Sequence, residues 1–505
     1  MKKIFAHSVP TVALILTFAF VMSSCQNFEV LEKDPNRAVS APASLVFNGV
    51  LNDMYNNVNG GSAWGDKARW NQFYCSNYNY YSTNEYTWTT TDFSFFTLKN
   101  VIKMEEEAKR GGAADVNPYS ALGKFFRAYF YEDMTKRVGD VPLNDALKGL
   151  EMTTPKYDSQ KAVYVQVLKW LDGANDDLTA LIAKGDRTLA GDIYLGNDLR
   201  KWQKVVNAFK LRVLVSLSKQ EADGELQVKQ RFAEVLSNPT KFPVMTSMGD
   251  NMQYVFNNFN KYPRNPSNFG FNATRENMAK TYVDLLVARR DPRIFVVAEP
   301  AEAKIKAGLK ATDHEAYVGA SSGEDLADMS TKALNGEYSF QKRSRYYAND
   351  VGEALFIIGY PEMCFNLAEG INRGWATGDA AEWYRRGIAA SMGHYGITDA
   401  TALATYLDGT LVKYAGNNAT GLNQVLTQKY IAFFQNSGLE AFYNNRRTGI
   451  PTFLTGVGTG NSSRIPKRWQ YPSTERNTNA TNYNAALSTQ YTGKDDINDM
   501  MWILK

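Results

Sequence analysis

The chain has 505 residues and a formal charge of +4, with 56 Lys and Arg against 52 Asp and Glu. Hydrophobic residues make up 44% and charged residues 21%, which is typical of a folded protein that buries a substantial core. So dilute a positive charge argues against nucleic acid binding, and three Cys exclude a disulfide framework or a four-Cys zinc site.

The first 24 residues are typical of a bacterial export signal that precedes a lipid attachment site. Lys2 and Lys3 form a basic start, and the uncharged run from Thr11 to Met22 is too short to span a bilayer as a helix. Small residues then lead into Cys25 in the order Val-Met-Ser-Ser-Cys. We therefore expect cleavage before Cys25 and a mature protein held to a membrane by acyl chains such as palmitate. The alternative is an ordinary signal peptide that happens to end near a Cys.

Residues 25–42 predict a flexible, lipidated tether, because they are polar, lack a period and contain Pro35 and Pro42. Residues 43–505 are expected to form a single ligand-binding body. No other segment reaches 18 consecutive apolar residues, so we expect no membrane span. With Cys25 acylated, Cys75 and Cys364 remain as thiols, and the sequence leaves open whether they pair.

Apolar residues recur at helical spacing through most of the body. Asn117-Pro118 and Gly139-Asp140 punctuate the second of these stripes as start and stop signals. The pattern predicts a mainly α fold of tetratricopeptide-like helical pairs. Between them lie long stretches that are rich in aromatics and therefore expected to be ordered loops. The predicted helices cover 47–58, 122–134, 163–182, 202–217, 278–286, 358–371, 380–392, 422–434 and 439–443, and the loops cover 60–97, 245–274, 298–350 and 449–491.

Aromatic residues are concentrated between positions 64 and 96, where they account for 12 of 33 residues against 13% overall. Asn residues are interleaved with them at positions 71, 77, 79 and 84. A sugar ring stacks its C–H face on an aromatic ring, while its hydroxyls bond to amides and phenols. The alternative is that these aromatics fill core beneath a long loop. Residues with a polar edge suit a site better than Phe, so the predicted ligand-binding residues are Trp64, Trp70, Tyr80, Tyr81 and Trp88.

A second amide–aromatic stretch runs from Tyr254 to Phe271. It is either the other wall of a site or a structural loop, and Pro263 and Pro266 favour the structural loop.

Signatures of catalysis are weak. Beyond the signal segment there are two His, and His394 follows a helical stripe where it can satisfy backbone carbonyls. The G-x-S-x-G match at 319–323 lacks the strand and helix of a nucleophile elbow and is interpreted as a flexible loop. The acidic run from Asp495 to Asp499 lacks the Gly and distal Glu of a calcium loop and is interpreted as a solvated turn. We therefore expect no enzyme activity, no metal and no cofactor.

Several short motifs, in this order and spacing, resemble the SusD/RagB family of nutrient-binding outer-membrane lipoproteins. They are Lys-Asp-Pro-Asn at 33–36, Arg-Ala-Tyr-Phe-Tyr at 127–131, Gly-Asp-Val-Pro-Leu at 139–143, the Trp202–Leu214 helix, Asp-Pro-Arg-Ile at 291–294, Tyr-Pro-Glu-Met at 360–363, Asn-Leu-Ala-Glu at 366–369, Gly-Leu-Glu-Ala-Phe-Tyr-Asn-Asn-Arg-Arg-Thr-Gly-Ile-Pro at 438–451, and 464–477, together with the lipobox at Cys25.

The resemblance implies a SusD-like helical fold on the outside of the cell outer membrane. It also implies a SusC-like TonB-dependent transporter as partner, to which a captured glycan, or in some members a peptide, is delivered. Binding residues vary between members, so none is carried over. The motif residues are interpreted as structural, and we expect Arg446 and Arg447 to form buried ion pairs.

Three hypotheses follow. The first is a non-catalytic glycan-binding lipoprotein, with stacking and hydrogen bonds in a preformed groove. The second is oligopeptide capture, which needs donors and acceptors directed at a peptide backbone. The third is a surface glycosidase, which needs two carboxylates about 5–10 Å apart in a cleft.

Overall fold

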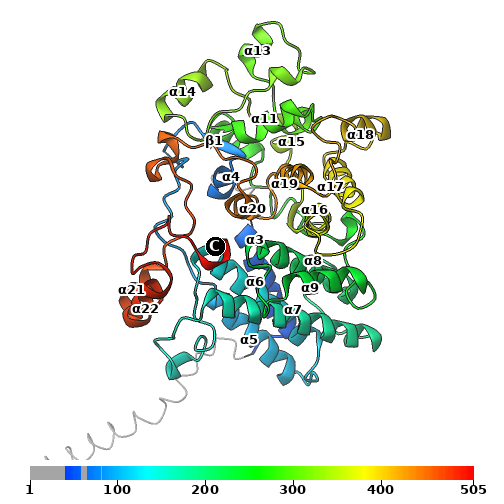
Figure 1. Ribbon diagram of the computed structural model, residues 1–505, viewed down its shortest axis with the longest axis vertical. Helices are drawn as coiled ribbons and strands as arrows, with labels where there is room; N and C mark the ends of the chain where they lie inside the picture. The colour runs from blue at the N-terminus through cyan, green and yellow to red at the C-terminus, as the bar shows by residue number, and fades with distance from the viewer. Residues whose placement is uncertain (1–39, 59–64, 81) are drawn as a thin grey trace, which may run out of the picture. The chain divides into compact units, whose positions relative to one another are not determined.

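The structure is a computed structural model, and it describes residues 40–58, 65–80 and 82–505. By their internal contacts, residues 43–505 form one unit. Successive long helices pack side by side in its first half, and the last four of them occupy the lower half of the view in Figure 1. These helices are α3 (Ala43–Val58), α5 (Phe95–Arg110), α6 (Pro118–Val138), α7 (Gln160–Ala183) and α8 (Leu199–Ser216).

Helix α6 shows why the chain folds locally as its sequence predicts. The Asn117 side chain accepts hydrogen bonds from the backbone amides of Tyr119 and Ser120, at 2.9 and 3.1 Å, and so caps the start of the helix. The helix ends at Gly139, whose φ of +96° favours glycine. A Cβ there would also lie 2.1 Å from the hydroxyl oxygen of Tyr491. The predicted start and stop signals are therefore confirmed, and the helix extends four residues beyond the predicted 122–134 span at each end.

A second group of helices packs in pairs beside α8. Gly370 lets α16 approach the Phe232 ring so closely that a Cβ would lie 2.1 Å from its Cζ atom. Together the two groups form the mainly helical fold that the sequence predicts. The second group consists of α16 (Tyr360–Asn372), α17 (Ala380–His394), α19 (Ala419–Ala432) and α20 (Glu440–Thr448), with α9 (Val228–Ser237) against α8.

The long predicted loops contain short helices and strands that helical periodicity does not reveal, because most of them make fewer than three turns. Two antiparallel sheets of two strands each join distant segments: β1 (Tyr74–Ser76) with β3 (Glu276–Met278), and β2 (Met252–Tyr254) with β4 (Leu355–Ile358). The remaining helices are α4 (Asp66–Trp70), α10 (Phe269–Asn272), α11 (Lys280–Ala288), α12 (Ile294–Val297), α13 (Glu302–Lys306), α14 (Leu326–Leu334), α15 (Arg343–Tyr346), α18 (Ala400–Leu407), α21 (Ser473–Thr478) and α22 (Ala480–Gln490).

Buried ion pairs join the helices of the core. Arg447 binds the carboxylate of Glu369 through both terminal nitrogens, one of them at 2.9 Å, as the sequence predicts. The prediction is wrong for Arg446, which instead donates to the backbone carbonyls of Lys136 and Lys467, both at 2.8 Å. This guanidinium satisfies orphan carbonyls rather than a carboxylate.

The two thiols of the body, Cys75 and Cys364, are both buried and unpaired, so the pairing that the sequence left open does not occur here. Within the described ranges, no helix combines the length and the apolar character needed to cross a membrane.

Candidate functional site: a tyrosine ledge beyond strand β1

The base of the candidate site is a buried ion network beneath strands β1 and β3. The Glu276 carboxylate lies 2.8 Å from Arg264 and 3.5 Å from Arg69, and all three side chains are almost completely buried. Burial alone would lower the pKa of Arg264, but the charge of Glu276 outweighs it and keeps that pKa above its ordinary value. Removing one member would leave an uncompensated buried charge, so the network ties Glu276 of β3 to Arg69 and Arg264.

Buried amides then fix the turn that follows β1. Asn84 accepts from the Ser76 amide at 2.7 Å and donates to the Ser76 carbonyl at 2.8 Å. Asn77 donates to the Thr274 carbonyl at 3.1 Å. Asn71, further back, donates to the Gly438 carbonyl at 2.8 Å. These three amides, among those interleaved with the aromatics, are therefore structural, because unpaired buried amides are costly.

The turn presents two tyrosines at the surface. Tyr78 is 42% exposed and Tyr80 is 74% exposed, with ring centroids 6.4 Å apart and an interplanar angle of 31°. The guanidinium carbon of Arg275 lies 3.8 Å from the centroid of the Tyr78 ring, a cation–π contact. We call Tyr78, Tyr80 and Arg275 the tyrosine ledge. Its rings are the kind of accessible aromatic surface on which the C–H face of a sugar stacks.

The structure places the other predicted site residues differently. Trp88 is a correction: it is only 2% exposed and stacks on Trp469 with centroids 3.5 Å apart, so it belongs to the core and offers no face to a ligand. Trp70 is half-buried against the edge of Trp88 and donates its indole N–H to the Glu85 carbonyl at 3.2 Å. Trp64 and Tyr81 lie outside the described residues.

Tyr78 is a candidate that the sequence prediction omitted, although a signal was present. Tyr78 lies two positions before Tyr80 in the same aromatic segment and carries the phenol hydroxyl that set the predicted residues apart from Phe. The prediction named Tyr80 and Tyr81 and left out Tyr78, although the same criterion applies to all three.

The second amide–aromatic stretch is largely structural. Tyr254, Phe256 and Tyr262 pack against one another or against Tyr55 of α3. Phe259 is the exception, at 97% exposed, and sits on a turn in which Asn257 accepts from the Phe259 amide at 2.9 Å.

The weak catalytic signals have structural explanations. Gly319 and Gly323 of the G-x-S-x-G match pack closely on neighbouring backbone, where a Cβ on Gly323 would lie 2.3 Å from the carbonyl carbon of Thr455. Asp495, expected in a solvated turn, is instead a buried partner of Arg468 at 2.5 Å. In the part of the chain that the structure describes, no group of three or more His, Cys, Asp or Glu residues is placed to hold a metal.

Comparison with known proteins decides the family. A family model described as "Starch-binding associating with outer membrane", SusD-like, matches residues 35–472. The chain belongs to the SusD-like family. Among solved structures, a SusD homolog from Bacteroides fragilis NCTC 9343 is 30% identical with a TM-score of 0.83, and the alignment covers 92% of this chain and all of that one.

Other solved structures extend the likeness. A candidate outer membrane nutrient-binding protein from Bacteroides vulgatus ATCC 8482 is 32% identical, with a TM-score of 0.80 over 92% of this chain and 100% of the other. A chitin-binding SusD homolog from Flavobacterium johnsoniae is 20% identical, with a TM-score of 0.72 over 92% and 98%, and it shares the fold. A search of curated proteins gave no match.

Proposed function

We propose that this SusD-like protein captures a glycan at the cell surface and that the tyrosine ledge is where the sugar stacks. The observation that carries the proposal is the exposure of Tyr80 on a turn whose base is fixed by buried amides and ion pairs. A site held in its binding conformation loses little entropy when ligand arrives. The family description, starch-binding, and the chitin-binding homolog both point to a saccharide as the ligand class.

The ledge donates and accepts as a sugar requires. The two tyrosines carry phenol hydroxyls, and the Arg275 guanidinium lies beside the Tyr78 ring. The hydroxyl groups of a sugar can form hydrogen bonds with each of these polar groups. Trp64, Tyr81 and the half-buried Trp70 remain proposed ligand contacts. Trp88 does not, because it is only 2% exposed and its ring packs against Trp70, Phe442 and Trp469.

The proposal excludes catalysis by this chain, and one incubation tests both statements. The full chain is mixed with amylopectin, chitin or xylan, and protein depletion is measured together with new reducing ends. We expect depletion by at least one polysaccharide without any increase in reducing ends. Depletion with new reducing ends would show a glycosidase, and retention only on a peptide column would favour oligopeptide capture.

We further propose that the captured glycan passes to a SusC-like TonB-dependent transporter in the outer membrane, as the resemblance implies. Acyl chains on Cys25 would hold the protein at the cell surface beside that barrel. Co-purification of a barrel protein with the tagged lipoprotein from solubilised outer membranes tests the partnership. Recovery of the lipoprotein alone, under conditions in which other outer-membrane complexes survive, would contradict it.

A further inference from the structure

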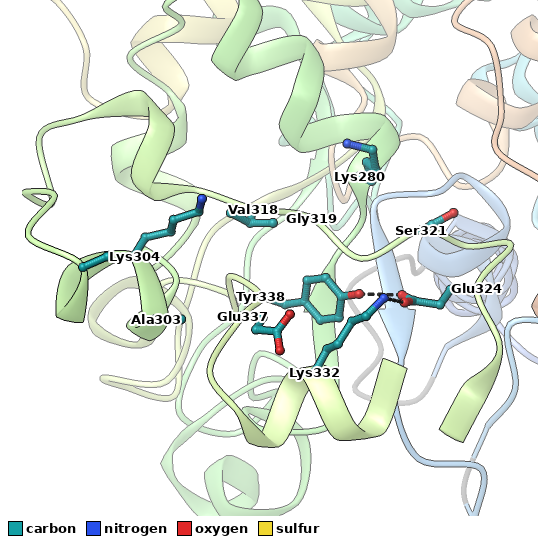
Figure 2. A pocket seen from close by; sticks show the side chains of 11 residues that line it. Lys280, Ala303, Lys304, Val318, Gly319, Ser321, Glu324, Lys332, Glu337 and Tyr338 are labelled. Carbon is teal, nitrogen blue, oxygen red and sulfur yellow. Dashed lines mark hydrogen bonds and ion pairs between the residues drawn. The ribbon is translucent and has the colours of Figure 1, made fainter. Parts of the chain in front are cut away.

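A pocket of about 670 Å³ opens on another part of the surface, between α11, α13 and α14 (Figure 2). Lys280, Lys304 and Lys332 line it, together with Glu324 and Glu337. Ala303, Ala307 and Val318 supply apolar surface between these charges. None of these residues takes part in the tyrosine ledge.

The pocket is built on hydrogen-bonded backbone. Residues 318–320 form the floor, and hydrogen bonds hold this segment on both sides. The Lys280 amide donates to the Ala320 carbonyl at 2.7 Å, and the Ser339 amide donates to the Val318 carbonyl at 2.8 Å. Helix α13 is fixed in turn, since the Ala303 amide donates to the Gly336 carbonyl at 2.9 Å. The walls are therefore positioned before any ligand binds, which lowers the entropy cost of binding.

Among the residues that line the pocket, positive charges exceed negative charges once the pairs within the lining are set aside. Glu324 is engaged by both the Lys332 ammonium and the Tyr338 hydroxyl, the latter at 2.6 Å, as Figure 2 shows. Within the described ranges, the ion pair of Lys280 is with Asp284 of its own helix, and both side chains are about half exposed, so this pair is weak. Among the described residues, the ion pairs of helix α13 join Lys306 to Glu302 and include none with Lys304.

We infer that this pocket is a second saccharide subsite, one that takes a sugar bearing a carboxylate or a sulfate ester. The inference rests on the proposed glycan binding and narrows its ligand class. In Figure 2, Lys304 and Lys280 lie on opposite sides of the Val318–Gly319 backbone. An anionic group receives a charge-assisted hydrogen bond from Lys304, with Lys280 adding positive charge at the other side of the pocket, while the ring lies against the alanines and Val318. Glu337 accepts from a neutral hydroxyl of the same sugar.

The pocket and the ledge lie on two sides of helix α14. Ser330 donates to the Asn77 carbonyl at the base of the ledge, whereas Lys332, two residues further along the helix, lines the pocket. Residues two apart on an α-helix point about 200° away from each other. The ledge and the pocket therefore adjoin different faces of the same helix.

The test compares an acidic glycan with a neutral one on the full chain. Polygalacturonate and chondroitin sulfate are the two acidic probes, which separate carboxylate from sulfate ester, and the polysaccharide that depletes the wild type is the neutral probe. The double variant Lys280→Gln/Lys304→Gln removes the two available ammonium groups. Lys306→Gln is the matched control, because it lies on the same helix as Lys304, removes one positive charge and interrupts only a pair with Glu302.

We expect the affinity of the double variant for at least one acidic probe to be lower than that of the wild type by about fivefold or more. The reason is that the variant has lost the ammonium groups that donate charge-assisted hydrogen bonds. Lys306→Gln should change that affinity by less than about twofold. Raising salt should weaken acidic binding and leave neutral binding unchanged. Equal losses in the double variant and in Lys306→Gln, or no binding of either acidic probe, overturns the inference. Retention of the neutral glycan in that case leaves the proposed function standing, whereas loss of all glycan binding by the wild type removes both.

Discussion

Trp88 is a core residue whose contacts are almost all aromatic. Its ring stacks on Trp469 at an interplanar angle of 4° and meets the edge of Phe442 with centroids 4.7 Å apart. Trp88→Ala should therefore lower the free energy of unfolding by about 3–5 kcal/mol, as for other large core aromatics. Chemical denaturation measures this. Phe96→Ala is the control, since Phe96 is 70% exposed and should change stability by less than about 0.5 kcal/mol. Equal, small effects would contradict the assignment of Trp88 to the core.

Glu369 is a fully buried carboxylate that faces three basic side chains. Burial opposes its ionisation, but Arg447, Lys429 and Arg373 outweigh that effect and lower its pKa from 4.5 to about 2. A lowered carboxyl pKa stabilises the fold above the unfolded value of 4.5, and this contribution is lost as pH falls from 4.5 towards 2. Its full size is about 3 kcal/mol.

We expect the unfolding free energy of Glu369→Gln to fall below that of the wild type at pH 6–7, and the difference to shrink below pH 4.5. Denaturation midpoints at pH 7, 5 and 3 give the measurement. A difference that stays constant over this range would show that the Glu369 charge contributes nothing to stability.

For single residues, the sequence predicts an aromatic-rich segment but not which of its side chains are buried and which are exposed. From Asn84 to Trp88, buried and exposed residues alternate, so Tyr86 and Trp88 point inward while Glu85 and Thr87 face solvent. The register of that alternation depends on contacts with Trp469 and Phe442, which are more than 350 positions away. No local pattern encodes it, and so Trp88 was mistaken for a ligand contact while Tyr78 was overlooked.

Helix boundaries were more predictable than loop contents, because caps and apolar stripes are local signals. The Asn117 cap and the Gly139 stop are both visible in the sequence and both present in the structure. Helices α13 and α14 fall within a predicted loop, since one has 5 residues and the other 9. Helix α13 is held by hydrogen bonds from the Ala301 and Ala303 amides to the Ala316 and Gly336 carbonyls, and α14 by the bond from Ser330 to the Asn77 carbonyl, rather than by their own periodicity.

Substitution of a helical glycine by alanine tests how closely the paired helices pack. Gly370→Ala would push a methyl group into the buried Phe232 ring, so we expect a loss of about 1–3 kcal/mol from overpacking. Gly393 lies in α17 with open space around it, and Gly393→Ala should instead stabilise the protein by up to about 1 kcal/mol through helix propensity. Thermal unfolding of the two variants side by side provides the comparison. Two changes of the same sign and size would contradict close packing at Gly370.

Considered as a whole, the molecule combines a helical scaffold with long ordered segments that carry the exposed aromatic and charged surfaces. β1 at the upper end of the view in Figure 1 is well separated from α5 at its lower end. The ledge follows β1, and Phe96 lies in the first turn of α5. Phe96 is therefore an exposed aromatic on a different region of the same protein, which makes it a suitable control for ligand binding.

Membrane attachment is also a property of the whole chain. If acyl chains on Cys25 are the anchor, Cys25→Ala should move the protein from the membrane fraction to the soluble fraction, because those chains supply the membrane affinity. Fractionation followed by immunoblotting tests this, with Cys75→Ala as a control that changes a buried thiol. Continued membrane retention of Cys25→Ala would contradict the lipid anchor.

The most direct test of the account is calorimetric titration of the polysaccharide retained by the wild type into the double variant Tyr78→Ala/Tyr80→Ala. We predict that its affinity falls by about tenfold or more, since each stacked ring contributes on the order of 1 kcal/mol. Phe96→Ala should bind as the wild type does. Unchanged affinity in the double variant, with its stability intact, would show that the tyrosine ledge is not the glycan site.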